Sequence, residues 1–140
     1  MIKDCNVGVK GVVLVGDSCL ILQKGTGANA YWDIPGGRID DDETLEQTLR
    51  RELSEELPSL GKYQIGSVVS ACRLSKNIQD DKALVLIFYT IKADAFEVAL
   101  SDEHVGYRWV TKETLPELRT SGLKIEEGYY NALTRALELG

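Results

Sequence analysis

Apolar residues along this chain gather in short runs that are separated by polar or glycine-rich turns. Residues 7–15 and 19–23 form two such runs around the turn Gly16-Asp17-Ser18, and this pattern predicts a β-hairpin. The run over 83–91 is almost continuously apolar, which is typical of a strand that is covered on both faces. The full set of predicted strands covers residues 7–15, 19–23, 31–34, 63–74, 83–92 and 107–110.

The segments between these runs are predicted to be turns and loops. Residues 25–30 are small and polar, which indicates a loop, and Pro35-Gly36-Gly37 indicates a turn. The polar residues 75–81 are expected to form the tip of a hairpin between the two long strands on either side.

A helical spacing replaces the strand pattern in three places. Leucines recur every four residues between 45 and 57, which predicts a helix over about 44–57 with one buried stripe. A short helix is predicted near 112–118 and a closing helix over 125–139. The chain is therefore predicted to be one α/β unit without repeats or low-complexity linkers.

The size and charge of the chain exclude several classes of protein. Its 140 residues fit a single domain, which we expect to span residues 1–140. A net charge of −6 argues against a nucleic-acid binder, because such a protein needs a basic surface. No apolar run approaches the roughly eighteen residues of a membrane span, and Asp4 and Asn6 interrupt any signal peptide. The three isolated cysteines predict buried free thiols in a reducing cytoplasm.

The predicted helix over 44–57 ends in three clustered carboxylates, Glu52, Glu55 and Glu56. Like charges at this spacing repel one another, and the C-terminus of a helix disfavours anions. The three positions cover an arc of roughly 100° on one side of the helix. Their oxygens can therefore converge on one or two hard cations such as Mg²⁺. The alternative is a solvated acidic helix face, since most charge runs lie on the surface.

The residues around these glutamates match a known signature. The segment 37–59 resembles the box of the Nudix hydrolases, G-x5-E-x7-R-E-U-x-E-E-x-G-U, in which U is a bulky aliphatic residue. The matching residues are Gly37, Glu43, Arg51, Glu52, Leu53, Glu55 and Glu56. The segment 32–37, Trp-Asp-Ile-Pro-Gly-Gly, is similar to the one that usually leads into the box.

Two positions depart from this signature. Pro58 stands where the family has a glycine, and Ser59 stands where it has an aliphatic residue. Glycine at the first position would cap the helix with a positive φ. Proline cannot adopt that conformation, so the helix must end by a different turn.

The resemblance implies an α/β/α sandwich, with a mixed sheet between helices, over nearly the whole chain. It implies that the three glutamates bind Mg²⁺ or Mn²⁺ and that Arg51 braces them. It also implies a supporting role for Glu43 from just outside the metal ligands. Gly36 and Gly37 have an ordinary interpretation as turn residues, but the resemblance implies that the backbone around the cluster needs residues without Cβ.

A further acid outside the box belongs to the same resemblance. The segment 101–110 is similar to a Nudix segment in which an acid precedes a Trp-Val strand, and some members use that acid as a metal ligand or general base. Glu103 has the matching spacing, so the implied catalytic set is Glu55, Arg51 and Glu103, with either Glu55 or Glu103 as the base. His104 is the only histidine and is expected to be incidental beside this acid.

The implied reaction is hydrolysis of a diphosphate bond in a nucleoside diphosphate that is linked to another group. Nudix members that use ADP-ribose or dinucleoside polyphosphates often carry a proline or tyrosine past the box, and residues 74–77 contain neither. This favours a MutT-type hydrolase of normal or oxidised nucleoside triphosphates, or a nucleotide-sugar hydrolase, over an ADP-ribose hydrolase. Tyr31 and Trp32 are candidates to stack on a base. A small nucleotide is thus the expected partner, and a homodimer is left open.

Two other functional classes fit the sequence less well. A Nudix-fold nucleotide-binding module without hydrolysis need not keep all three glutamates, and here all three are present. A calcium-binding protein is suggested by Asp40-Asp41-Asp42, but an EF-hand needs glycine at its sixth position, and Leu45 stands there.

Overall fold

The computed structural model describes residues 4–40, 42–74 and 83–139. Seven strands form one mixed sheet: β1 (Cys5–Val15), β2 (Ser18–Lys24), β3 (Tyr31–Asp33), β4 (Gly36–Arg38), β5 (Tyr63–Leu74), β6 (Ala83–Ala93) and β7 (Gly106–Val110). The main path through the sheet is β3-β2-β1-β6-β5. Strand β1 pairs in parallel with β6, whereas its pairings with β2 and β4 are antiparallel. Strand β7 pairs with β2.

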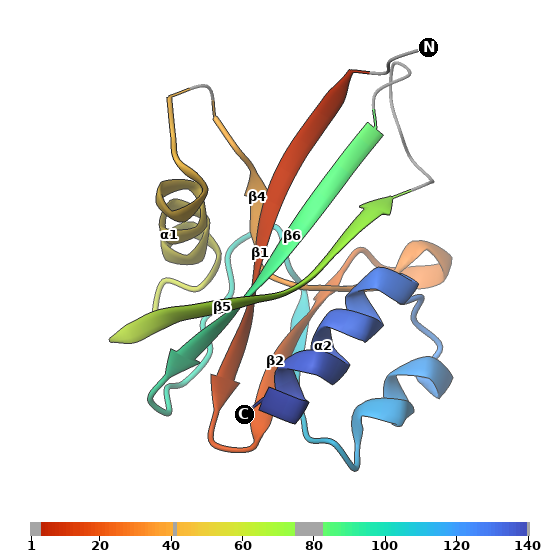
Figure 1. Cartoon of the computed structure of the whole chain (residues 1–140). Helices are drawn as coiled ribbons and strands as arrows, with labels where there is room; N and C mark the ends of the chain where they lie inside the picture. The colour runs from red at the N-terminus through yellow and green to blue at the C-terminus, as the bar shows by residue number, and fades with distance from the viewer. Residues whose placement is uncertain (1–3, 41, 75–82, 140) are drawn as a thin grey trace.

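Helices cover the two faces of this sheet. Helix α1 (Leu45–Glu56) and helix α2 (Glu127–Leu139) lie on opposite sides of the strands, as Figure 1 shows in gold and blue. Two short 3-10 helices, η1 (Gly27–Asn29) and η3 (Leu115–Thr120), lie in the connections. The predicted α/β/α sandwich with a mixed sheet is confirmed. Across the described residues, no helix combines the length and the apolar character that crossing a bilayer requires.

Side chains of β1 alternate between two hydrophobic cores because successive residues of a strand point to opposite faces. Val9 and Val13 pack with α1, while Val12 and Leu14 pack with α2. The predicted leucine stripe of α1 is confirmed, since Leu49, Leu53 and Leu57 are fully buried and Leu45 packs at its edge. Each such side chain contributes about 1.5–3 kcal/mol when it leaves water. The position of α1 over β1 is therefore fixed by packing.

Several details differ from the sequence predictions. Gly36 and Gly37 belong to strand β4 rather than to a turn, because their backbone pairs with β1. The cover of β6 is incomplete, since Val85 and Ile87 are only half-buried. Cys19 is buried as expected, but Cys5 is exposed. The predicted hairpin tip over 75–81 lies outside the described residues.

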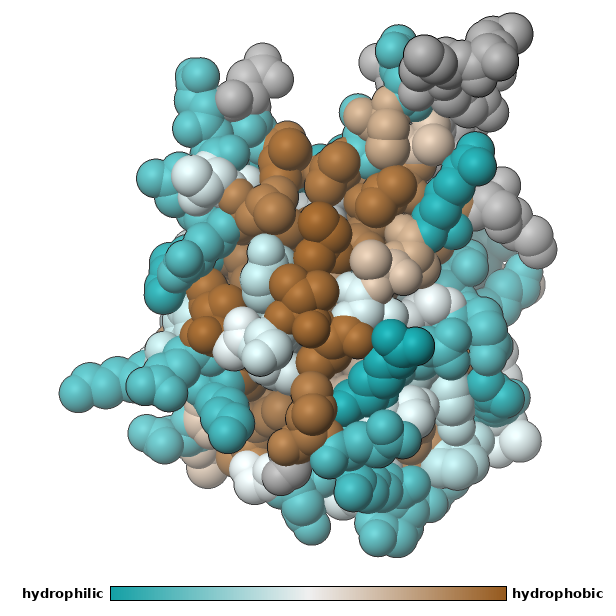
Figure 2. All heavy atoms as spheres, in the orientation of Figure 1, coloured by the Kyte–Doolittle hydropathy of each residue, from teal (hydrophilic) through white to brown (hydrophobic). Residues whose placement is uncertain are grey.

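Part of the apolar surface remains open to solvent. Val68 of β5 is 52% exposed, and Ile39, which follows β4, is 38% exposed. Figure 2 shows apolar side chains gathered along the middle of the face in view, with hydrophilic side chains on both sides. Because α1 covers only one end of its face of the sheet, the incomplete cover of β6 has a direct structural explanation.

Candidate active site

Helix α1 is fixed at both ends, and this places its glutamates. At the start, Thr44 forms a capping box: its hydroxyl accepts a hydrogen bond from the backbone N–H of Gln47, and the Gln47 side chain accepts one from the backbone N–H of Thr44. At the end, Leu57 leaves the helical conformation with φ −127° and ψ 70°. A following proline disfavours the α region at this position. The helix thus ends directly after Glu56.

The residue that departs from the box after Pro58 makes a tertiary contact. The Ser59 hydroxyl accepts a hydrogen bond from the backbone N–H of Ala99 at 3.0 Å and donates one to the carbonyl of Glu97. These bonds tie the exit of α1 to the segment that leads to Glu103 and His104. An aliphatic side chain at this position would make neither bond.

We expect Ser59→Ala to lower the free energy of unfolding by about 1 kcal/mol, the usual contribution of a lost hydrogen bond. Chemical denaturation followed by circular dichroism measures this. Ser54→Ala is the matched control, because the Ser54 hydroxyl bonds only the carbonyl of Arg51 within its own helix. An equal effect of the two substitutions would contradict the bridging role of Ser59.

Arg51 links three carboxylates. Its Nε and Nη2 donate to the two oxygens of Glu43 at 2.8 and 2.9 Å, which is a bidentate contact. Its Nη1 donates to Glu52 Oε1 at 3.0 Å and lies 3.6 Å from Glu55 Oε2. The hydrogen bonds from Arg51 lower the pKa of Glu43, with a smaller contribution from the Thr48 hydroxyl. The structure therefore brings together the guanidinium and the acids that the sequence associated with it.

Glu52 lies directly over the glycine strand β4. Its side chain is only 15% exposed, and its carboxylate occupies the space in which a Cβ on Gly37 would lie. A Cβ there would lie 2.9 Å from Glu52 Oε2 and still closer to Oε1. Because Gly37 has no Cβ, it leaves room for the Glu52 carboxylate. This agrees with the expectation that the backbone around the cluster needs residues without Cβ.

We expect Gly37→Ala to leave the fold intact, because the atoms it meets are the end of a flexible side chain. The displaced Glu52 carboxylate should weaken Mn²⁺ binding by about 10-fold or more, the range for changes beside a metal ligand. Calorimetric Mn²⁺ titration checks this, with a thermal melt to verify folding. Wild-type affinity in the folded variant would contradict the placement of Glu52 against Gly37.

Glu55 and Glu56 differ sharply in exposure. The Glu55 side chain is 58% exposed, whereas Glu56 is only 2% exposed. The backbone N–H of Gly36 donates to Glu56 Oε2 at 2.9 Å. Burial raises the pKa of Glu56 to about 8, against the opposing effects of that hydrogen bond and of the Lys10 charge. A cation that binds this carboxylate below that pH would displace a proton.

Three residues that the sequence prediction left out of the site lie around Glu56. Lys10 Nζ donates to Asp33 Oδ1 at 3.2 Å, and His104 Nε2 lies 2.9 Å from Asp33 Oδ2 and 3.6 Å from Glu56 Oε1. Burial alone would raise the pKa of Asp33, but Lys10 and His104 outweigh it and lower the pKa to about 2. Asp33, Glu56 and His104 present ligand atoms within 4.8 Å of one another.

Glu103, the candidate from outside the box, is exposed, and its backbone N–H bonds the Ser101 hydroxyl. The residue that faces Glu56 from this segment is its neighbour His104. The one local signal for the additional residues was Lys10, a charge inside an otherwise apolar run. Trp32, a candidate for base stacking, is buried, and its ring N–H donates to the Ser121 hydroxyl at 2.9 Å.

The donor set of α1 fits a hard divalent cation. Glu52, Glu55 and Glu56 offer carboxylate oxygens, the ligands that Mg²⁺ and Mn²⁺ prefer, and Glu55 extends into solvent. Arg51 balances part of their negative charge without occupying every oxygen. The same residues that the sequence associated with Mg²⁺ or Mn²⁺ are therefore candidates to hold such an ion.

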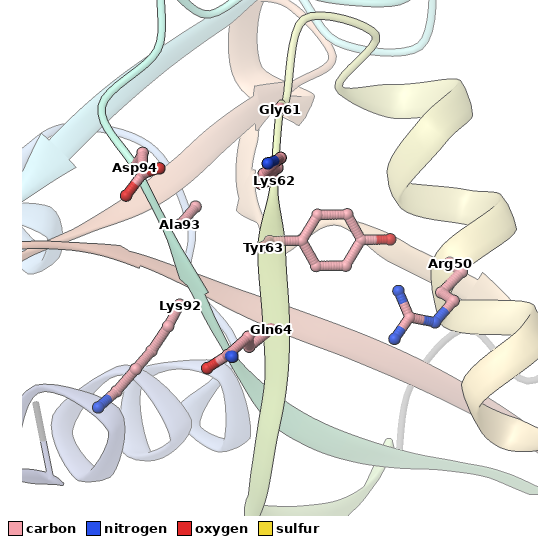
Figure 3. A pocket seen from close by; sticks show the side chains of 8 residues that line it. All are labelled: Arg50, Gly61, Lys62, Tyr63, Gln64, Lys92, Ala93 and Asp94. Carbon is pink, nitrogen blue, oxygen red and sulfur yellow. The ribbon is translucent and has the colours of Figure 1, made fainter.

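Two cavities lie near this region. One of about 630 Å³ is lined by basic residues that include Arg50, Lys62 and Lys92, and in Figure 3 Arg50 and Tyr63 point toward each other across it. None of the three glutamates lines it. The other, of about 950 Å³, lies on the α2 side of the sheet and is lined in part by Tyr31 and Tyr129. The Tyr129 ring lies 5.7 Å from Lys10 Nζ, so this cavity adjoins the buried residues around Glu56.

The sheet lies between α1 and α2, which makes this a small α/β/α domain. Helix α1 ends in three glutamates beside β4, and they form a carboxylate-rich candidate active site. The model of the NUDIX domain matches residues 6–131. The chain belongs to the NUDIX family.

Similar proteins agree with this placement. The chain is 36% identical over 64 residues to an 8-oxo-dGTP diphosphatase of Proteus vulgaris. This alignment covers 44% of this chain and 50% of that protein. It is 30% identical over 94 residues to the nucleoside triphosphatase NudI of Escherichia coli K12, with 60% and 64% covered. The alignments thus span half to just under two thirds of these relatives.

A solved structure shows the same fold. The MutT protein from Methanosarcina mazei Go1 superposes with a TM-score of 0.72 at 22% identity, and the match covers 99% of this chain and 96% of that one. At this identity the likeness concerns the fold alone. It extends the agreement beyond the box helix to nearly the whole chain.

Proposed function

We propose that this protein hydrolyses the diphosphate bond of nucleoside diphosphate derivatives in a reaction that depends on Mg²⁺ or Mn²⁺. The observation that carries this proposal is the arrangement of Glu52, Glu55 and Glu56 at the end of α1, with Arg51 bonded to Glu52 and Glu43. A bound cation would neutralise the diphosphate charge and lower the pKa of the attacking water. Membership of the NUDIX family supports this class of reaction.

The side chains divide the work according to their exposure. Water attacks one phosphorus, the bond from that phosphorus to the bridging oxygen breaks, and the attacking water loses a proton. Glu55 is our first candidate to accept this proton, and its exposure and its long contact with Arg51, at 3.6 Å, support that role. Glu103 is the second candidate for this role, since it is exposed and no hydrogen bond or ion pair to the described residues holds its carboxylate.

The substrate we favour is a nucleoside triphosphate or an oxidised nucleoside triphosphate. The names of the two relatives, an 8-oxo-dGTP diphosphatase and a nucleoside triphosphatase, support it. The cavity of about 950 Å³ is the candidate for the base, because its aromatic and apolar residues, among them Tyr31, Leu123 and Tyr129, suit a flat ring. The three free cysteines support a reducing cytoplasm as the location.

A substrate panel tests the proposal. Normal and oxidised nucleoside triphosphates, nucleotide sugars, ADP-ribose and dinucleoside polyphosphates are incubated with the protein, with and without Mg²⁺ or Mn²⁺, and the products are separated by chromatography. We expect the highest kcat/KM among the triphosphates. Preference for a nucleotide sugar or ADP-ribose would move the substrate within the same reaction class. No turnover of any compound would favour a nucleotide-binding module and overturn the proposal.

A further inference from the structure

Four ionisable side chains lie buried together beneath the candidate metal ligands. Lys10, Asp33, His104 and Glu56 are 9%, 4%, 5% and 2% exposed. They come from β1, β3, the segment before β7 and α1. Burying charged groups is costly, and apolar side chains of similar volume often stabilise a fold as well or better. Packing alone therefore gives no reason for this cluster.

The hydrogen bonds define one arrangement of protons. His104 Nδ1 is buried and has no hydrogen-bond partner among the described residues. The Asp33 carboxylate only accepts hydrogen bonds, so His104 Nε2, at 2.9 Å from Asp33 Oδ2, carries a proton. That Nε2–H donates to Asp33 Oδ2, while Lys10 donates to Asp33 Oδ1. Both oxygens of Asp33 are thus engaged, and the His104 ring is held in one orientation.

This arrangement fixes the place of the Glu56 carboxylate. Gly36 N–H holds Oε2 at 2.9 Å, and the His104 ring limits the movement of Oε1 from the other side at 3.6 Å. Lys10 forms its ion pair with Asp33 and not with Glu56, so Glu56 is the carboxylate of the two that a cation can use. The Lys10 ammonium beside Asp33 opposes a second cation inside the cluster itself.

We propose that Lys10, Asp33 and His104 are positioning residues that orient the Glu56 carboxylate for the cation, an inference that rests on the metal-dependent function proposed above. They act through Glu56 and touch neither substrate nor metal. Outer residues that orient a metal ligand typically change metal affinity 10- to 100-fold when they are replaced.

The test measures Mn²⁺ binding to the nucleotide-free protein by electron paramagnetic resonance of the unbound ion. Asp33→Asn and His104→Phe should each weaken Mn²⁺ binding by about 10- to 100-fold without changing the number of ions bound. His104→Gln should restore most of the affinity, because its amide N–H can replace the Nε2 donor, whereas phenylalanine keeps only the ring. Thermal melts show which variants fold. If His104→Phe does not fold, the Mn²⁺ affinity of Asp33→Asn tests the inference.

A double-mutant cycle tests whether the effect passes through Glu56. In the Glu56→Gln background, Asp33→Asn should change Mn²⁺ affinity less than about 2-fold, because coupled residues are not additive. Glu117→Gln is the control, since it removes a carboxylate from the exposed ion pair with Arg108. It should leave Mn²⁺ binding unchanged.

Three results would overturn the inference: wild-type affinity in folded Asp33→Asn and His104→Phe variants, a full additive loss in the Glu56→Gln background, or a lower number of bound ions when His104 is replaced. The last would make His104 a metal ligand. A different outcome separates the two proposals. If the variants change Mn²⁺ binding as expected but the wild-type protein hydrolyses no nucleotide, the proposed function is overturned and the positioning role is supported.

Discussion

Glu55→Gln should lower kcat by about 10²- to 10⁴-fold, the range for loss of a group that transfers a proton in the reaction. The substitution keeps the shape of the side chain and removes its charge, so it removes both a metal ligand and a candidate base. The side chain is 58% exposed, so the fold should not depend on it. Steady-state hydrolysis of the best substrate at saturating Mg²⁺ measures the effect.

The matched control for this prediction lies on the same helix. Glu46 is also exposed, and it forms an ordinary i,i+4 ion pair with Arg50 on the surface of the helix. Glu46→Gln should retain wild-type kcat and KM. Equal kinetics of Glu55→Gln and the wild type, with both proteins folded, would contradict the assignment of Glu55 to the site.

Gly36→Ala should destabilise the protein by about 3 kcal/mol or more, which is among the larger effects of a single substitution. Gly36 has φ 149°, a conformation that favours glycine. A Cβ there would overlap the carbonyl oxygen of Val9 and approach Lys10 Cα to 2.7 Å. These are backbone atoms of the central strand, so they cannot move aside without disturbing the pairing of β1 and β4.

The measurement is the unfolding free energy from chemical denaturation, together with the melting temperature, which should fall by roughly 10 °C. Gly61→Ala is the control, because a Cβ at Gly61 meets no atom within 4 Å. It should change stability by no more than about 0.5 kcal/mol. If the two variants were equally stable, the close approach of the Gly36 backbone to β1 would be wrong.

The sequence predicted the elements of this fold better than their arrangement. The helix over 44–57 carried its own signal, a leucine every four residues, and the structure places α1 at Leu45–Glu56. The cap at Thr44 is seen only in the structure. The parallel pairing of β1 with β6 joins residues far apart in the chain, and no local pattern encodes it. Strand β4 was missed because three residues, two of them glycine, carry no strand pattern of their own.

The candidate site divides in the same way. Arg51, Glu52 and Glu55 lie on one helix, and the resemblance to the Nudix box implied that Arg51 braces these acids. In the structure Arg51 contacts both of them. Asp33 and His104 come from separate elements and meet only when the sheet has formed. The roles of Glu103 and of the metal ligands remain predictions, and no local pattern predicted the burial of His104.

The measurement that tests the central claim most directly is the dependence of nucleotide hydrolysis on a divalent cation. The protein is freed of metal with EDTA, and release of phosphate or pyrophosphate from a nucleoside triphosphate is followed before and after Mg²⁺ is restored. The account predicts no turnover without the cation and recovery of full activity with it. Undiminished hydrolysis in EDTA, or none after Mg²⁺ or Mn²⁺ is added to any nucleotide substrate, would contradict it.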